Sequence, residues 1–182
     1  MWARAAFAYE GPARRALMSL KFGSVRSVAD ALVPWMQQAA AGELTAAGTR
    51  SAGAAITWVP LSPGRRRERG FDQAEALARG LATRCRLPAR GLLRRVRETP
   101  PQARRGADER RRAIRGAFRV IEDPPPTTVL VDDVLTTGAT ADACARALRD
   151  AGSSAVGLVT AARSLAGALP ARCYTRDVWI LS

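Results

Sequence analysis

Residues 129–140 read Val129-Leu130-Val131-Asp132-Asp133-Val134-Leu135-Thr136-Thr137-Gly138-Ala139-Thr140. The aliphatic, partly β-branched first half predicts a strand that is buried on both faces. Charged Asp132 and Asp133 are costly to bury, so we expect the strand to end in this pair, at the edge where open α/β sheets bind ligands. Residues 141–151 are rich in Ala, Leu and Arg, which favours a helix. The stretch therefore predicts a strand, an acidic pair, a small turn and a helix.

The turn between that strand and helix is suited to binding phosphate. Thr136 to Thr140 have little side-chain bulk, so backbone N–H groups at the start of the helix can surround a phosphate, helped by the helix dipole. The turn has neither the lysine of a Walker loop nor the spacing of a dinucleotide fingerprint. Carboxylates beside a phosphate can accept hydrogen bonds from sugar hydroxyls and hold Mg²⁺ directly or through water. The competing interpretation is an ordinary turn with a threonine N-cap and solvated aspartates.

This stretch resembles the phosphoribosyl pyrophosphate (PRPP) binding motif of the type I phosphoribosyltransferases. The resemblance implies that Asp132 and Asp133 form the catalytic pair, which holds the ribose hydroxyls and binds Mg²⁺. The implied fold is α/β, with a central, mostly parallel sheet flanked by helices and a mobile hood loop. The implied site for the 5-phosphate consists of Thr136, Thr137, Gly138, Ala139 and Thr140.

Length and composition favour one α/β domain with a full core. The 182 residues divide into an N-terminal helical or hood segment (1–53), a phosphoribosyltransferase-like core (54–164) and a C-terminal tail (165–182). We find no apolar run of membrane-spanning length and no signal-peptide core, so we expect a cytoplasmic protein. Histidine is absent, which excludes Ser-His-Asp triads and HExxH zinc sites. The three cysteines lack C-x-x-C spacing and support neither a disulfide framework nor a zinc site.

The formal net charge of +13 comes almost wholly from arginine. Such a surface attracts polyanions, either nucleic acid or pyrophosphate, although an arginine bias also arises from codon composition. Residues 65–70 concentrate this charge in an expected loop, which is a candidate pyrophosphate site or simply a solvated basic turn. The charge by itself does not choose between these functions.

Patterns elsewhere predict the remaining elements. We expect helices over about 12–22, 25–41 and 71–84, strands over 54–59, 92–96, 117–121 and 155–161, and loops over 42–54 and 60–70. Asp72, just before the third helix, could repel pyrophosphate or cap the helix, and capping is favoured. The end of the last strand, from Thr160, should lie beside the acidic pair.

Trp58-Val59-Pro60-Leu61-Ser62, together with Arg69-Gly70-Phe71-Asp72-Gln73-Ala74, resembles the signature of the ComF family. These are phosphoribosyltransferase-like proteins associated with DNA uptake in competent bacteria. The similarity covers roughly Phe7 to Arg163, and the chain starts after the place where the zinc ribbon of many ComF proteins would end. The resemblance implies a pyrophosphate loop that contains Pro60, Leu61, Ser62, Arg65 and Arg69, and a hood that contains Gln102 and Arg110.

Three functions are compatible with this sequence. The first is a Mg²⁺-dependent protein that binds PRPP or a related nucleotide and transfers the phosphoribosyl group. The second is a non-catalytic module for single-stranded DNA or a DNA-import helicase, which the arginine clusters favour but the scarcity of interleaved aromatic residues does not. The third, ranked last, resembles the phosphoribosyltransferase-fold repressors. The acceptor and the oligomeric state are left open.

Overall fold

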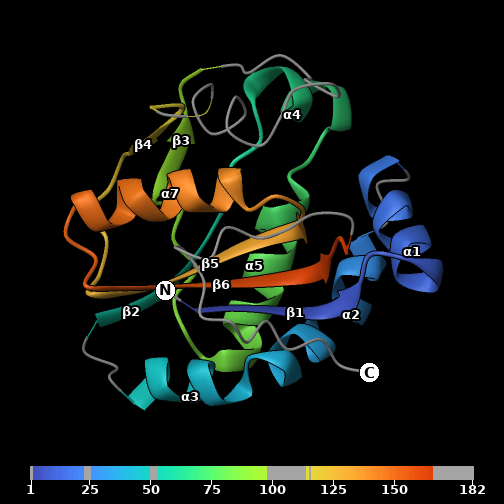
Figure 1. The fold of residues 1–182 in the computed structure, drawn as a ribbon, viewed down its shortest axis with the longest axis horizontal. Helices are drawn as coiled ribbons and strands as arrows, with labels where there is room; N and C mark the ends of the chain where they lie inside the picture. Colours follow the sequence, from blue (N-terminus) through green and yellow to red (C-terminus); the bar gives the residue numbers. More distant parts are fainter. Residues whose placement is uncertain (1, 23–25, 50–52, 98–113, 115, 166–182) are drawn as a thin grey trace.

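The protein is described by a computed structural model that covers residues 2–22, 26–49, 53–97, 114 and 116–165. Its centre is a four-stranded parallel sheet in the order β1-β6-β5-β2 (Figure 1). These strands are β1 (Trp2–Ala8), β6 (Ala155–Arg163), β5 (Thr127–Leu135) and β2 (Ala54–Trp58). A small antiparallel sheet pairs β3 (Leu93–Arg95) with β4 (Phe118–Val120). The expected α/β class is confirmed, and the parallel sheet with its flanking helices is consistent with a type I phosphoribosyltransferase-like fold.

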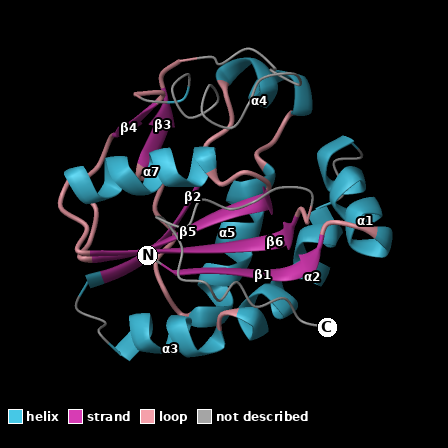
Figure 2. Ribbon diagram, in the orientation of Figure 1, coloured by secondary structure: helices cyan, strands magenta, loops and turns pink. Residues whose placement is uncertain are grey.

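Helices lie on both faces of the central sheet and give a three-layered arrangement (Figure 2). The core of one face is shared with α1 (Gly11–Phe22), α2 (Arg26–Ala39), α3 (Ala41–Thr49) and α5 (Gln73–Cys85). The core of the other face is shared with α7 (Ala139–Asp150) and the small sheet. The remaining helix, α4 (Pro63–Arg69), has no buried residues. In the described part of the chain, no helix is both long and apolar enough to span a bilayer.

Strand β5 is buried on both faces, as its aliphatic run predicts. Val129 and Val131 belong to the core shared with α5, whereas Leu130 belongs to the core shared with α7. The expectation that this strand ends at the acidic pair is wrong, because β5 runs on to Leu135. The strand is longer because β6 continues to pair with it as far as Arg163.

The N-terminal part differs from the sequence-based expectation in two places. Strand β1 was not predicted, and it becomes an edge strand through parallel pairing with β6. The loop expected over 42–54 is also wrong, because α3 occupies most of it. Leu44 and Ala47 are buried in the core there, and this packing outweighs the low helix propensity of Gly42.

The loop expected over 60–70 is wrong in its second half, where α4 forms. Ser62 is the N-cap, and its hydroxyl accepts a hydrogen bond from the Arg65 N–H at 3.4 Å. Pro63 occupies the first turn, and Gly70, with φ of 73°, ends the helix. The other expected helices and strands are present, with ends that shift by a few residues. The hood loop expected over 98–112 and most of the tail (166–182) lie outside the described residues.

The connections that follow β2 and β5 run to opposite sides of this strand pair, and the position of the ligand site follows from this. After β2 it passes through α5 to Ala89, which forms a parallel bridge with Ile56. The bonds of Ile56 to Pro88 and Arg90 lie on the edge of β2 that faces away from β5. After β5 the chain passes through α7 to β6, on the other side. Open α/β sheets bind ligands at such a switch point, outside the carboxyl ends of the strands.

Candidate functional site

The acidic pair lies where β5 loses one of its two neighbours. Strand β2 ends at Trp58, and the last bond on that side is from the Val59 N–H to the Val131 carbonyl at 2.9 Å. Asp132 follows immediately, and on the opposite side it is still paired with Thr160 of β6. The backbone of the acidic pair is therefore fixed by pairing with β6. It has no strand neighbour on the β2 side, so a ligand can approach the pair from that side.

The two carboxylates leave the strand on opposite sides, because side chains alternate along a β-strand. Asp133 Oδ2 lies 2.7 Å from Lys21 Nζ of α1. Asp132 lies on the side of α7, where its charge adds to the effect of burial in raising the pKa of the Cys144 thiol. Each carboxylate also accepts a hydrogen bond from the next backbone N–H, at 2.8 Å for Asp132 and 2.7 Å for Asp133.

The two carboxylates have different electrostatic surroundings. Burial raises the pKa of Asp132 well above its ordinary value, the Asp133 carboxylate raises it further, and Lys21 acts in the opposite direction. Of the two carboxylates, the one that forms an ion pair with Lys21 is that of Asp133. Burial and the neighbouring Asp133 carboxylate thus both favour the neutral form of Asp132, and Lys21 acts against them.

A cavity of about 160 Å³ connects the acidic pair with the segment that follows β2. From that segment, Pro60, Leu61, Arg65 and Arg69 line the cavity, all of them named from the sequence. The structure thus brings together two groups of predicted residues that are about seventy positions apart in the chain. The cavity also has cationic side chains that the sequence interpretation did not assign to it, Lys21 and Arg95.

The threonine turn encloses a smaller cavity of about 40 Å³ next to the first. All five residues of the turn line it, and Asp132 and Thr140 line both cavities. Helix α7 starts directly after the turn, and its N-cap is Gly138 in the left-handed conformation, with φ of 73°, instead of a threonine. The threonine hydroxyls are therefore not used as the N-cap.

Asp72 and Ser62 have structural roles beside the cavity. Asp72 Oδ1 accepts hydrogen bonds from the N–H groups of Ala74 and Glu75, so the expected capping of α5 is confirmed. Its Oδ2 accepts a bond from the Leu61 N–H at 3.0 Å, which ties the loop after β2 to α5. Ser62 is 7% exposed and caps α4, so its hydroxyl is directed into its own helix.

Three polar or charged residues that line the cavity were not assigned to a site from the sequence, namely Lys21, Gln73 and Arg95. Lys21 had one available signal, since it is the only lysine in the chain. Gln73 also had a signal, since it lies in the stretch that resembles the ComF signature, whereas Arg95 had none, because one arginine among many is ordinary. The predicted hood residues Gln102 and Arg110 lie outside the described residues.

The carboxylates at the candidate site are too few to hold Mg²⁺ alone, but they can hold it together with the phosphates of a bound ligand. In the described ranges, no three Asp, Glu, Cys or His side chains are grouped as a metal site would require. Mg²⁺ is commonly held by one or two carboxylates plus substrate phosphates, and Asp132 and Asp133 can supply the carboxylates. These two residues therefore fit a cation that arrives with a phosphate ligand.

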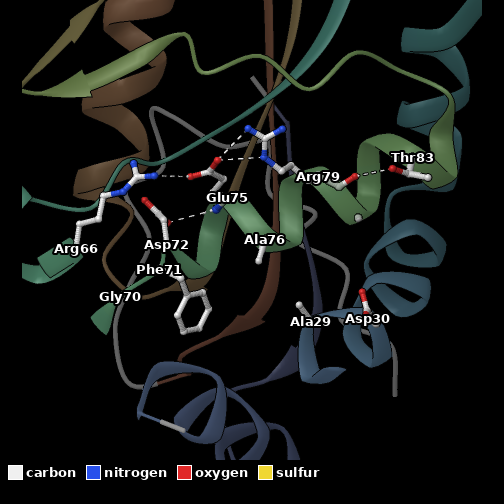
Figure 3. A pocket seen from close by; sticks show the side chains of 11 residues that line it. Ala29, Asp30, Arg66, Gly70, Phe71, Asp72, Glu75, Ala76, Arg79 and Thr83 are labelled. Carbon is white, nitrogen blue, oxygen red and sulfur yellow. Dashed lines mark hydrogen bonds and ion pairs between the residues drawn. The ribbon is translucent and has the colours of Figure 1, made fainter. Parts of the chain in front are cut away.

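A larger cavity of about 550 Å³ lies beside α5 and is lined by residues between Arg66 and Thr83, together with Ala29 and Asp30 of α2. Figure 3 shows Glu75 between Arg66 and Arg79, which it contacts at 3.2 and 2.9 Å. Neither aspartate of the acidic pair lines this cavity, and none of the threonines of the turn does. We place the candidate site at the smaller cavity, because the acidic pair lines it and the phosphate turn adjoins it.

Comparison with curated proteins finds a similarity to a competence protein. The chain is 35% identical over 103 residues to Competence protein F of Haemophilus influenzae, a match that covers 54% of this chain and 45% of that protein. The chain therefore spans less than half the length of this curated relative. No family model matches. The similarity to Competence protein F supports assignment of the chain to the ComF family.

Proposed function

We propose that this ComF-type chain binds PRPP together with Mg²⁺ across the carboxyl ends of β2 and β5. One observation carries the proposal. The acidic pair and the threonine turn belong to a single β5–α7 unit, and the arginines after β2 line the same cavity as that pair. A sugar that carries a phosphate at one end and a pyrophosphate at the other matches this order of groups.

In the proposed complex, the 5-phosphate lies in the turn of residues 136–140, at the N-terminus of α7. The ribose hydroxyls donate hydrogen bonds to Asp132 and Asp133. The pyrophosphate lies among Lys21, Arg65 and Arg69, whose charges oppose its own. The ligand is thus bound through both of its charged ends.

The proposed reaction is transfer of the phosphoribosyl group with release of pyrophosphate. Positive charge develops at the anomeric carbon as pyrophosphate leaves, so the site has to orient the sugar and stabilise the departing anion. Bound Mg²⁺ would neutralise part of that charge. Such chemistry needs no histidine, in keeping with the composition of the chain. The biological role that we propose is linked to competence, by similarity to Competence protein F.

Isothermal titration calorimetry with PRPP, with and without Mg²⁺, tests the proposal. The intact chain is compared with Asp132→Asn/Asp133→Asn and with the control Asp150→Asn, an exposed residue at the end of α7. We expect Mg²⁺-dependent binding that the double variant loses and the control keeps, with all three proteins folded by circular dichroism. No binding by the folded intact chain, or equal affinity in the double variant, would overturn the proposal.

A second candidate function is binding of single-stranded DNA, and one surface favours it. Helix α4 has no buried residues and carries four arginines in seven positions, Arg65, Arg66, Arg67 and Arg69. Phosphate backbones are attracted to such surfaces, with an affinity that falls steeply as salt rises. Fluorescence anisotropy with a labelled oligonucleotide at low and high salt tests this function. Absence of binding at low salt would exclude it.

A further inference from the structure

We infer that Gln73 is a ligand-contacting residue, whose side-chain amide donates a hydrogen bond to the pyrophosphate end of the bound ligand. This inference rests on the proposed function and assigns one more contact to it. It concerns the cavity that contains the arginines, as distinct from the threonine turn, where the 5-phosphate is proposed to bind.

The position of Gln73 places it at the cavity but out of contact with bulk water. It is the first residue of α5, directly after the N-cap Asp72. Its side chain is only 2% exposed, yet it lines the same cavity as Asp132 and Asp133. A long polar side chain buried at this place needs hydrogen-bond partners, because an unmet donor carries a desolvation cost.

The contact with Arg69 determines which way the amide faces. Arg69 Nη1 donates a hydrogen bond to Gln73 Oε1 at 3.1 Å. A guanidinium group has only donors, so the amide cannot be flipped to present its nitrogen to Arg69. The Nε2 group is therefore left for another acceptor, and it has no hydrogen-bond partner within the described part of the chain.

The two carboxylates of the acidic pair, which line the same cavity, already interact with other groups. Asp133 contacts Lys21 with one oxygen and accepts the Val134 N–H with the other. Asp132 Oδ1 accepts the Asp133 N–H. The cationic side chains that line the cavity favour an anion inside it. An oxygen of a bound pyrophosphate group is therefore the acceptor that best suits Gln73 Nε2.

The test uses two probes that divide the ligand, inorganic pyrophosphate with Mg²⁺ and ribose 5-phosphate. The variants are Gln73→Glu, which keeps an acceptor for Arg69 but has no N–H donor, and Gln73→Met, which has a similar shape and no polar group. We expect affinity for pyrophosphate and PRPP to fall by about tenfold or more, as for loss of a charge-assisted hydrogen bond. Affinity for ribose 5-phosphate should change by less than about twofold.

The control is Gln38→Met, at an exposed position on α2 away from the cavity. A purely structural role of Gln73 would lower the melting temperature and weaken both probes alike, which would overturn the inference. Unchanged pyrophosphate affinity in both Gln73 variants would also overturn it, and would leave the proposed function standing if the Asp132→Asn/Asp133→Asn variant still loses PRPP. If the folded intact chain binds neither PRPP nor pyrophosphate, both fail.

A measurement without substitution covers the case in which the Gln73 variants do not fold. In the intact, ¹⁵N-labelled protein, the side-chain NH₂ signals of Gln73 should shift when pyrophosphate and Mg²⁺ are added and stay in place with ribose 5-phosphate. Signals of Gln73 that do not respond to saturating pyrophosphate would contradict the contact.

Discussion

Lys21 Nζ lies 2.7 Å from Asp133 Oδ2, so an ion pair joins α1 to the carboxyl end of β5. Both side chains are largely shielded, with 20% and 16% of their surface exposed. This pair connects the N-terminal helix to the candidate site and supplies a cation to one of the two carboxylates. It also suggests why a chain that otherwise uses arginine has a lysine here, since a compact ammonium group provides a point charge to a single carboxylate.

Lys21→Met should lower the free energy of unfolding by about 1–3 kcal/mol, because Asp133 then keeps a partly buried charge without its cation. Urea denaturation at neutral pH measures this change. Arg67→Met, at an exposed position on α4, is the matched control and should change stability by less than about 0.5 kcal/mol.

Adding Asp133→Asn to the Lys21→Met variant should restore part of the lost stability, because the unpaired charge is removed. A double variant whose loss equals the sum of the two single losses would show that the two groups do not interact.

Gly138 and Gly70 have the same left-handed conformation, with φ of 73°. Comparing an alanine substitution at each position therefore distinguishes the effect of backbone strain from an effect on ligand binding. An alanine at either position should cost about 1–2 kcal/mol of stability, because its Cβ is strained in that region. Only Gly138→Ala should also weaken binding of ribose 5-phosphate, because this glycine lines the cavity of the threonine turn and Gly70 does not. Thermal melts and calorimetry measure the two effects. Equal ribose 5-phosphate affinity in both variants would contradict the placement of the 5-phosphate in the turn.

Asp72 should make stability depend on pH in the acid range. Burial raises its pKa in the folded chain, although the N–H groups of Leu61 and Glu75 act in the opposite direction. The folded protein therefore binds this proton more tightly than the unfolded chain does. The stabilising contribution is fully present below the unfolded pKa and is lost as pH rises through the raised folded pKa.

Asp72→Asn removes this titration, so the stability of the wild type minus that of the variant should fall as pH rises across that window. Urea denaturation of both proteins in steps from about pH 3 to pH 7 gives the difference directly. A difference that is constant, or that increases with pH, would contradict the raised pKa. The variant also loses the acceptor for the Leu61 N–H, which adds an offset without changing this direction.

The elements predicted well from the sequence are those with strong local signals. Strand β5 has consecutive aliphatic residues, and α5 has apolar residues at helical spacing behind the capping Asp72. Strand β1 was missed because four of its seven residues are alanine, which has a low strand propensity. It forms a strand because it pairs with β6. Helix α3 was missed for a related reason, since it depends on burial of Leu44 and Ala47 in the core.

The acidic pair, the threonine turn and the basic segment after β2 could be identified from the amino-acid sequence, because each is a contiguous pattern whose chemistry is independent of the rest of the chain. The other side chains that line the site are set by the packing of distant segments. Lys21, Gln73 and Arg95 come from three separate elements, and parallel strand pairing with opposite connections at β2 and β5 brings these elements to one cavity. Contacts between distant segments depend on how the sheet is assembled, and no local pattern encodes that assembly.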